Sequence, residues 1–304
     1  MPQGELLDTA LVLLRLRALP MFVLALPLLA IEQIVLWYAG APLLDVYAGL
    51  DEWWPVIAAL FACEVAIVGV LGAYAGSAVV PALLGQNVSH WALFRRMRPL
   101  ALLVTMLLPV VVALLGAYFG MIGWIAGYGF LGMAGVALVV DRSGWPFGAL
   151  GRSAALATRL GWRGFWGRLR AFAVWLGIRV ALAIGPIMFL WQFGFVATAY
   201  FGDWSVLLMW GLAGTVSCAA LACFDAVLLI DTRIRTEGLD IALRRAAANG
   251  TDPADVVVHT PPRKFAPPVV LYSPASPPPA PPAPPAPPRL PGIVRPSAPS
   301  GRES

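Results

Sequence analysis

The sequence predicts an all-α fold: a polytopic membrane bundle of about six transmembrane helices with interfacial amphipathic helices beside it. Of its 304 residues, 60% are hydrophobic and only 12% are charged, whereas soluble domains contain roughly 25% charged residues. Several apolar stretches reach the ~20 residues that cross ~30 Å of hydrocarbon. Basic residues flank these stretches on one side only, which is typical of a membrane protein with a fixed orientation.

Six stretches satisfy the length for a membrane-spanning helix. In chain order they are residues 19–39, 55–80, 100–119, 121–140, 172–200 and 205–230. Little more than Gly120 and Gly123 joins the third stretch to the fourth. Together they define a predicted transmembrane domain over residues 19–230.

The orientation follows from the basic residues, because Lys and Arg resist translocation across the membrane. The connections on one side contain Arg15, Arg17, Arg95, Arg96, Arg98, Arg142, Arg152, Arg159, Arg163, Arg168, Arg170, Arg233, Arg235, Arg244 and Arg245. The opposite connections contain no base, only Asp45, Asp51, Glu52 and Asp203. We therefore expect a multi-pass protein of the cell (plasma) membrane with cytoplasmic N- and C-termini.

The first apolar run is too long for the core of a cleavable signal peptide and is expected to stay in the mature protein. The three cysteines, Cys63, Cys218 and Cys223, all fall inside predicted spans, where a thiol behaves as a small hydrophobic group. Their odd number and their depth argue against a disulfide framework.

Residues 1–18 have the pattern of an amphipathic helix that lies in the membrane plane, with apolar residues recurring at helical spacing. A second segment, residues 148–170, carries four arginines separated by seven, four and seven residues: Arg152, Arg159, Arg163 and Arg170. On a continuous helix these four side chains share one face. Gly161, Gly164 and Gly167 weaken that continuity.

The arginine face has two interpretations. It is a docking surface for anionic lipid headgroups or a phosphorylated ligand, or it only enforces the topology of the chain. Nucleic acid is not an expected partner, because Trp beside Arg is what a membrane interface selects.

Ionisable residues at membrane depth are the stronger candidates for a functional site, because each costs ~2.5–3.5 kcal/mol to insert without a partner. Glu32 and Glu64 are expected at nearly equal depth on antiparallel neighbouring helices. Two carboxylates that share a site do not both ionise easily, an arrangement suited to proton or cation movement. Alternatively, each makes a polar helix–helix contact with Gln33, Tyr38 or Tyr74.

Two further ionisable residues, Arg179 and Asp225, lie in the fifth and sixth predicted spans. An ion pair between them would fix how those helices pack. Glycines through the third and fourth spans, with the pairs Gly116–Gly120 and Gly123–Gly127, match the small-xxx-small pattern of closely packed helices. Packing within one bundle explains this pattern, and a homo-oligomer is the alternative.

After residue 230 the chain leaves the predicted membrane domain. Residues 231–249 are expected to form a cytoplasmic juxtamembrane helix that ends at Gly250 and Pro253. Residues 250–304 are dominated by proline and are predicted to be disordered or polyproline II. This tail is either a ligand for a protein partner that reads polyproline or a solvated spacer.

A resemblance to a known family rests on three segments. Residues 228–241, LLIDTRIRTEGLDI, resemble the ending of the last membrane helix in a family of actinobacterial multi-pass proteins related to the membrane domain of glycerophosphoryl diester phosphodiesterases. Residues 4–10 with 13–15 are similar to that family's N-terminal amphipathic helix, and residues 151–153 with 164–166 resemble its arginine-rich connection. The resemblance covers about residues 1–245. A catalytic barrel of ~250 residues has no room after the spans, so phosphodiester hydrolysis is not expected.

No catalytic residue, metal site or cofactor is predicted. The two histidines, His90 and His259, have no partner at a metal-ligand spacing, and no phosphate-binding or dinucleotide motif is present. Two function classes remain: a non-enzymatic module that organises the membrane or envelope, and a transporter or lipid-handling protein that uses Glu32 and Glu64.

Overall fold

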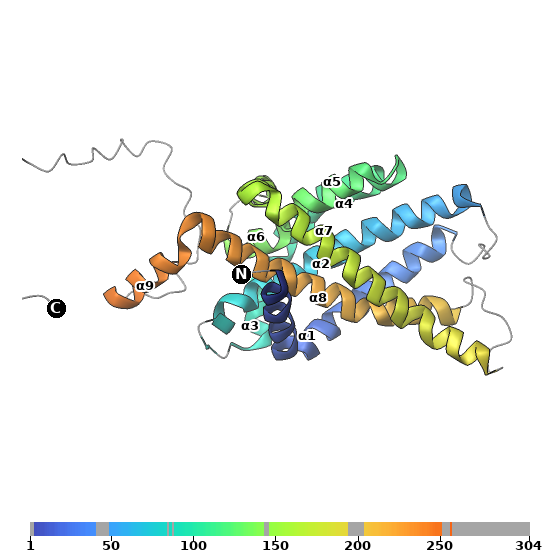
Figure 1. Cartoon of the computed structure of the whole chain (residues 1–304), viewed down its shortest axis with the longest axis horizontal. Coiled ribbons are helices and arrows are strands. Elements are labelled where there is room, and N and C mark those ends of the chain that lie inside the picture. The colour runs from blue at the N-terminus through green and yellow to red at the C-terminus, as the bar shows by residue number, and fades with distance from the viewer. Residues whose placement is uncertain are drawn as a thin grey trace, which may run out of the picture. The chain divides into compact units, whose positions relative to one another are not determined.

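The computed structural model describes residues 3–40, 49–83, 85–86, 88–142, 146–193, 204–250 and 256. Within these ranges every regular element is an α-helix (Figure 1), which confirms the predicted all-α fold. Six helical segments of the described chain are long and apolar enough to cross a membrane: Gly4–Tyr38, Leu50–Ala82, Pro99–Tyr118, Ile122–Val140, Phe147–Phe189 and Val206–Glu237. The predicted multi-pass membrane architecture therefore stands. The predicted tail lies almost entirely outside the described residues.

The first two long helices are α1 (Gln3–Tyr38) and α2 (Leu50–Leu83). Helix α1 bends at Arg17, whose φ of −127° and ψ of 20° are not helical. The bend lies one residue before the predicted end of the interfacial helix at residue 18. The Arg17 side chain donates to the carbonyl oxygen of Val88 over 3.3 Å, so the bend is held by a contact with the segment that precedes α3.

Four shorter helices follow: α3 (His90–Arg96), α4 (Pro99–Tyr118), α5 (Ile122–Leu131) and α6 (Ala134–Val140). Helices α4 and α5 form a close hairpin, because Gly116 and Gly123 leave no room for a Cβ atom between their backbones. Thus the glycines that the sequence singled out pack two helices of one chain together. The fourth predicted span is divided in two, since the helix is interrupted between Leu131 and Ala134.

The last three helices are α7 (Pro146–Gln192), α8 (Trp204–Glu237) and α9 (Leu239–Asn249). Helix α7 is interrupted at residues 159–162, where Leu160, Gly161 and Trp162 adopt positive φ angles of 54°, 67° and 66°. The expected weakness near Gly161 is therefore a break, so one continuous helix does not run through the arginine face. Gly238, with a φ of 63°, separates α8 from α9.

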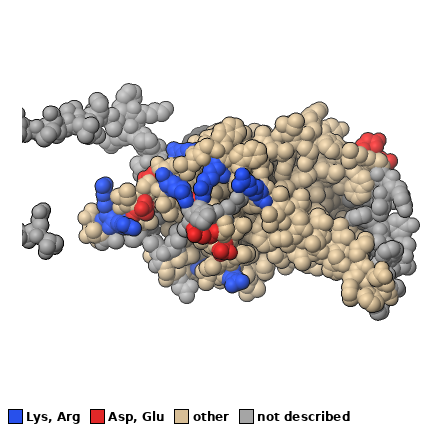
Figure 2. All heavy atoms as spheres, viewed as in Figure 1, with Lys and Arg blue, Asp and Glu red and all other residues tan. Residues whose placement is uncertain are grey.

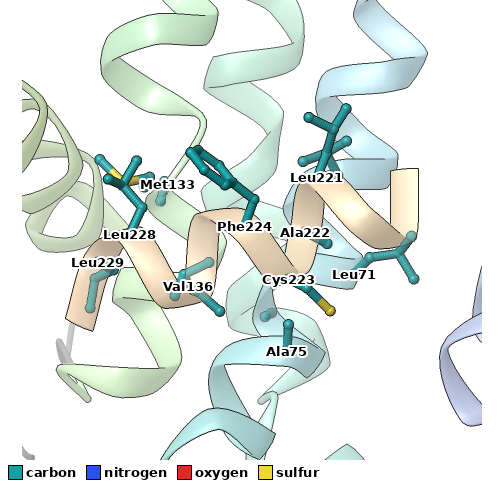
Figure 3. Close-up of a cluster of buried hydrophobic side chains, with 14 of the residues drawn as sticks. Leu71, Ala75, Met133, Val136, Leu221, Ala222, Cys223, Phe224, Leu228 and Leu229 are labelled. Atoms are coloured by element: carbon teal, nitrogen blue, oxygen red, sulfur yellow. The ribbon is translucent and has the colours of Figure 1, made fainter. Parts of the chain in front are cut away.

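Helix α8 is the centre of the bundle. Its most apolar window is 94% buried, compared with 28% in α1 and 33% in α4, and α8 packs against α1, α2 and α7. Figure 3 shows Phe224 and its neighbours on α8 packed against side chains from α2 and the α5–α6 region, such as Leu71 and Val136. Protein rather than lipid thus surrounds α8 on nearly all sides.

Helix α4, by contrast, exposes one apolar face. Leu100, Leu103 and Leu107 are 83%, 73% and 66% exposed, and their helical spacing places them together on the side away from the core. Such a face is what a helix presents to lipid tails. Figure 2 shows Lys and Arg gathered towards one end of the bundle and a broad uncharged surface beside it.

We call that end the basic end and define it by Arg95, Arg142, Arg152 and Arg233. At the opposite end α1 finishes at Tyr38, α2 begins at Leu50 and α8 begins at Trp204. Which end faces the cytoplasm is a prediction from the sequence.

Candidate functional site: buried charges inside the helix bundle

Arg179 on α7 lies at the centre of a buried charge cluster. Its Nη2 atom is 2.8 Å from Oε1 of Glu32 on α1, and its Nη1 atom is 3.7 Å from Oε1 of Glu64 on α2. The side chains of Arg179 and Glu32 are fully buried, and that of Glu64 is 2% exposed. We call Arg179, Glu32 and Glu64 the Arg179 cluster. It joins three helices at a depth where an isolated charge is strongly disfavoured.

Helix α8 contributes the fourth wall of the Arg179 cluster. The guanidinium carbon of Arg179 lies 4.4 Å from the centre of the Trp210 ring, a cation–π contact, and Nε of Arg179 donates to the Trp210 carbonyl oxygen over 3.4 Å. One turn later, a Cβ atom on Gly214 would lie 2.8 Å from Nη2 of Arg179. A glycine at residue 214 therefore makes space for the guanidinium group.

Hydrogen bonding in the Arg179 cluster is incomplete. Among the described residues, Oε2 of Glu32, Oε2 of Glu64 and Nη1 of Arg179 are buried without a hydrogen-bond partner. Both amide atoms of Gln33 have none either, whereas the side chain of Trp210 interacts with Glu32. Buried polar groups are normally satisfied, and two carboxylates face one guanidinium. This excess of unpaired polar atoms is the most distinctive chemical feature of the bundle.

A second arginine of α7, Arg168, makes a complete ion pair. Its Nε and Nη2 atoms donate to the two carboxylate oxygens of Asp225 on α8 over 2.8 and 2.9 Å. Its Nη1 atom donates to the carbonyl oxygen of Tyr128, and the guanidinium carbon lies 4.2 Å from the centre of the Tyr128 ring. Gly132 leaves the room that this guanidinium fills. We call Arg168 and Asp225 the Arg168 pair.

The structure corrects the predicted pairing of Arg179 with Asp225. Asp225 pairs with Arg168, while Arg179 pairs with Glu32 and Glu64. The prediction is wrong because it began the fifth span at residue 172 and left Arg168 in a polar connection. Helix α7 is already helical after the break that ends at Trp162, so Arg168 enters the bundle at the level of Asp225. A predicted fifth span that began before residue 168 would have placed Arg168 inside the bundle and indicated its pairing with Asp225.

The two carboxylates expected at equal depth do meet, but through an arginine. Sequence reasoning placed Glu32 and Glu64 together and offered Gln33, Tyr38 or Tyr74 as alternative partners. In the structure the hydroxyl group of Tyr74 lies 3.2 Å from Nδ1 of His90 instead. The sequence reasoning did not place Arg179 in this group. Its positive charge offsets part of the repulsion between the two neighbouring carboxylates.

The four arginines proposed as a lipid-facing surface are engaged within the chain. Arg152 contacts Asp141 over 2.8 Å and also Glu237, and Arg159 contacts Glu237 over 2.6 Å. Arg163 lies 3.9 Å from Asp231, and Arg170 also has an interaction within the chain. Because α7 breaks at residues 159–162, these side chains do not form one helical stripe. Arg152 and Arg159 join the start of α7 to the ends of α6 and α8.

An apolar pocket lies next to the Arg179 cluster, at the end of the bundle opposite the basic end. Its volume is about 400 Å³ and its wall is formed by side chains of α1, α2, α7 and α8: Leu36, Trp53, Val56, Ile57, Leu60, Ala183, Ile184, Val206, Leu207 and Trp210. Trp210 is therefore shared, because it lines the pocket and also stacks on Arg179. We call this cavity the Trp210 pocket. No local pattern in the sequence indicates this pocket, since its lining residues come from four separate segments.

Metal and redox chemistry have no evident centre in the described part of the chain. No group of three or more His, Cys, Asp or Glu side chains there is arranged to hold a metal ion. Cys218 and Cys223 are buried as free thiols, and Cys63 is half-buried. The chemistry that the described residues offer is that of a buried charge cluster beside an apolar cavity.

Comparison of the chain with protein-family models, with curated proteins and with solved structures finds no match. The resemblance to the phosphodiesterase-related membrane family therefore stays a prediction.

Proposed function

We propose that this chain is a non-enzymatic lipid-handling membrane protein, which binds a lipid-like amphiphile in the Trp210 pocket. The observation that carries the proposal is the position of Trp210. Its ring lines the apolar pocket and lies 4.4 Å from the guanidinium carbon of Arg179. An apolar cavity and an incomplete charge cluster thus share one wall, as a site for an amphiphilic molecule requires.

The pocket fits the apolar part of such a ligand. Its volume of about 400 Å³ lies within the range of ~300–1,000 Å³ that is common for small-molecule sites. Aliphatic side chains such as Val56, Leu60 and Ile184 dominate the wall, and they favour an acyl or isoprenoid chain over a polar solute.

The Arg179 cluster fits the polar part. When both carboxylates are ionised, Glu32 and Glu64 exceed the single guanidinium charge by one. Their free oxygen atoms and the amide of Gln33 are hydrogen-bonding groups with no partner among the described residues. A ligand headgroup with hydroxyl or amine donors would complement them, because unpaired buried acceptors are costly until a donor reaches them.

The competing role, a module that organises the membrane through its tail, depends on residues 250–304. The structure describes only Gly250 and Val256 in that range. The lipid-handling alternative uses Glu32 and Glu64, and the contacts of these two side chains are what support it here.

Native mass spectrometry of the protein released from lipid nanodiscs made from the expressing membrane tests the proposal. We expect the wild-type chain to retain a lipid. In Ile184→Trp the amount of retained lipid should fall at least tenfold, because the larger ring fills the pocket. Leu182→Trp is the matched control, since Leu182 lies on the same helix, is 46% exposed and does not line the pocket. Equal retention in both variants would overturn the assignment of the pocket.

A second variant tests the charge cluster. Glu32→Gln/Glu64→Gln removes two carboxylates and leaves the apolar wall unchanged. We expect it to lose or exchange the retained lipid species while the protein stays folded, as judged by its helical circular dichroism. An unchanged lipid spectrum would make the two carboxylates packing residues with no part in ligand binding.

A further inference from the structure

A second pocket, at the basic end, is lined by four arginines. Its volume is about 310 Å³, and Arg95, Arg96, Arg98 and Arg142 contribute to its wall together with Ser77 on α2. None of the described residues that line it carries a carboxylate. We call this cavity the arginine pocket. It lies at the far end of α2 from the Trp210 pocket, so its role is independent of the function proposed above.

These four arginines differ from the other arginines near them. Arg152, Arg159, Arg163, Arg233 and Arg235 each contact a carboxylate of the chain. Within the described ranges, Arg95, Arg96, Arg98 and Arg142 form no ion pair and no side-chain hydrogen bond. Their positive charge is left available, while that of the neighbouring network is neutralised internally.

Local structure explains how the chain brings these arginines together. Ser89 caps the start of α3, and its hydroxyl oxygen accepts from the backbone nitrogen of Ala92 over 3.4 Å. Met97 is only 2% exposed and anchors the end of α3. Arg98 then turns the chain in a left-handed conformation with a φ of 52°, and α4 begins at Pro99. The turn places three arginines at the pocket that the end of α2 helps to form.

The fourth arginine approaches from another element. Helix α6 ends at Val140, and Arg142 follows with a φ of 44°. Leu138 and Val140 line the same pocket beside Val80 and Pro81 of α2. One part of the wall is therefore cationic and the rest is aliphatic.

We infer that the arginine pocket binds the headgroup of an anionic phospholipid that carries at least two negative charges. Guanidinium groups match phosphate oxygens in both charge and planar geometry. Four guanidinium groups with no carboxylate beside them carry more positive charge than one monoanionic phosphodiester neutralises. The aliphatic wall would contact the glycerol and the first acyl carbons, which a soluble phosphate lacks. The pocket is formed where α2, α3 and α6 end, and α3 and α6 lie towards one end of the bundle (Figure 1). The end of a membrane bundle is the position at which a lipid headgroup meets a membrane protein.

The test uses purified protein in nanodiscs of phosphatidylcholine that contain 10 mol% of either cardiolipin or phosphatidylglycerol, with bound lipids counted by native mass spectrometry. Arg96→Gln/Arg142→Gln removes one arginine from each side of the pocket. The matched control is Arg244→Gln/Arg245→Gln, which removes the same charge from exposed residues of α9 that do not line the pocket. Thermal unfolding checks that both variants stay folded.

We expect the pocket variant, which lacks two arginines, to bind cardiolipin about 25-fold more weakly than wild type, since each basic residue near an anionic headgroup contributes a factor of about five in affinity. The control should bind within twofold of wild type, and phosphatidylglycerol should bind wild type more weakly than cardiolipin. Equal losses in the two variants would overturn the proposal, because they would indicate general attraction to an anionic surface.

A further arm separates lipid from soluble phosphate. Detergent-solubilised protein is titrated with pyrophosphate and with short-chain phosphatidic acid, and binding is followed by native mass spectrometry. The proposal predicts arginine-dependent binding of the lipid, with pyrophosphate at least tenfold weaker. If pyrophosphate bound in an arginine-dependent way while neither short-chain phosphatidic acid nor cardiolipin bound, the proposal would be contradicted. The pocket would then be assigned to a soluble anion.

Discussion

Two arginines of α7 are buried in contrasting ways. They are eleven residues apart, a rise of about 16 Å along a helix. Arg168 makes two short hydrogen bonds to a single carboxylate and a third to a backbone carbonyl. Arg179 makes one short hydrogen bond to Glu32, lies 3.7 Å from Glu64 and leaves Nη1 without a hydrogen bond.

The difference separates a structural ion pair from a candidate binding site. A buried pair offsets its desolvation only when the geometry is good and the remaining polar atoms are satisfied. The Arg168 pair meets that condition and ties α7 to α8. The Arg179 cluster does not, because several of its polar atoms are unpaired. The excess of unpaired groups, rather than the presence of buried charge, marks the site that a ligand would complete.

The largest expected effect comes from breaking the Arg168 pair. Asp225→Asn leaves the fully buried Arg168 guanidinium without its counter-charge, and we expect the free energy of unfolding to fall by about 3–5 kcal/mol. Denaturation by sodium dodecyl sulfate in mixed micelles, followed by circular dichroism, measures it. Asp8→Asn is the control, because Asp8 is exposed on α1; a loss for Asp225→Asn below about 1 kcal/mol would show that the pair is not structural.

Glycines beside the two guanidinium groups extend the comparison. A Cβ atom on Gly132 would fall inside the guanidinium of Arg168, whose carbon would be 2.6 Å away. Two bonds to Asp225 hold that group in place, so we expect Gly132→Ala to cost about 1–3 kcal/mol. A Cβ atom on Gly214 would lie 2.7 Å from Cδ2 of Leu29 and 2.8 Å from Nη2 of Arg179. Both are the ends of side chains that can shift, so Gly214→Ala should cost about 1 kcal/mol. The same unfolding assay ranks the two, and the reverse order would contradict the comparison.

The membrane bundle could be predicted from the sequence because the length of an apolar helix and the sidedness of Arg are local properties. The depth match of Glu32 and Glu64 followed from counting residues along two helices. The same counting did not identify Arg179 as the base between them, because the break at residues 159–162 decides how far α7 enters the bundle. That break depends on positive φ angles at Leu160 and Trp162, which residue preference does not indicate. Gly161 was the one local signal.

The two pockets were beyond sequence reasoning for a related reason. Each is assembled from helices that are distant in the chain, such as α1 with α7 and α2 with α6. An arginine in a connection has the same local signature whether it faces a carboxylate, as Arg152 does, or a pocket, as Arg142 does. Only packing distinguishes the two cases.

Smaller effects are expected from the carboxylates of the Arg179 cluster, and they should differ from each other. Glu32→Gln weakens a charged hydrogen bond of 2.8 Å, so we expect a loss of about 1.5 kcal/mol. Glu64→Gln changes a contact of 3.7 Å with no hydrogen bond and removes a charge that repels Glu32, so its loss should be smaller than that of Glu32→Gln. The micelle unfolding assay measures both. If Glu64→Gln proved as damaging as Asp225→Asn, the cluster would be a closed structural site like the Arg168 pair.

The smallest effect should be a gain, from Gly177→Ala on the stretch of α7 between the two arginines. A Cβ atom at residue 177 meets nothing within 4 Å, and the helical conformation there suits alanine, so the free energy of unfolding should rise by about 0.5–1 kcal/mol. The lipid retained in native mass spectrometry should be unchanged, because no contact of the Trp210 pocket is altered. Since the substitution touches neither arginine, a loss of bound lipid would mean that the Arg179 cluster needs α7 to flex at this point while the Arg168 pair stays fixed. That result would turn the comparison from two static sites into a fixed anchor and a movable site on one helix.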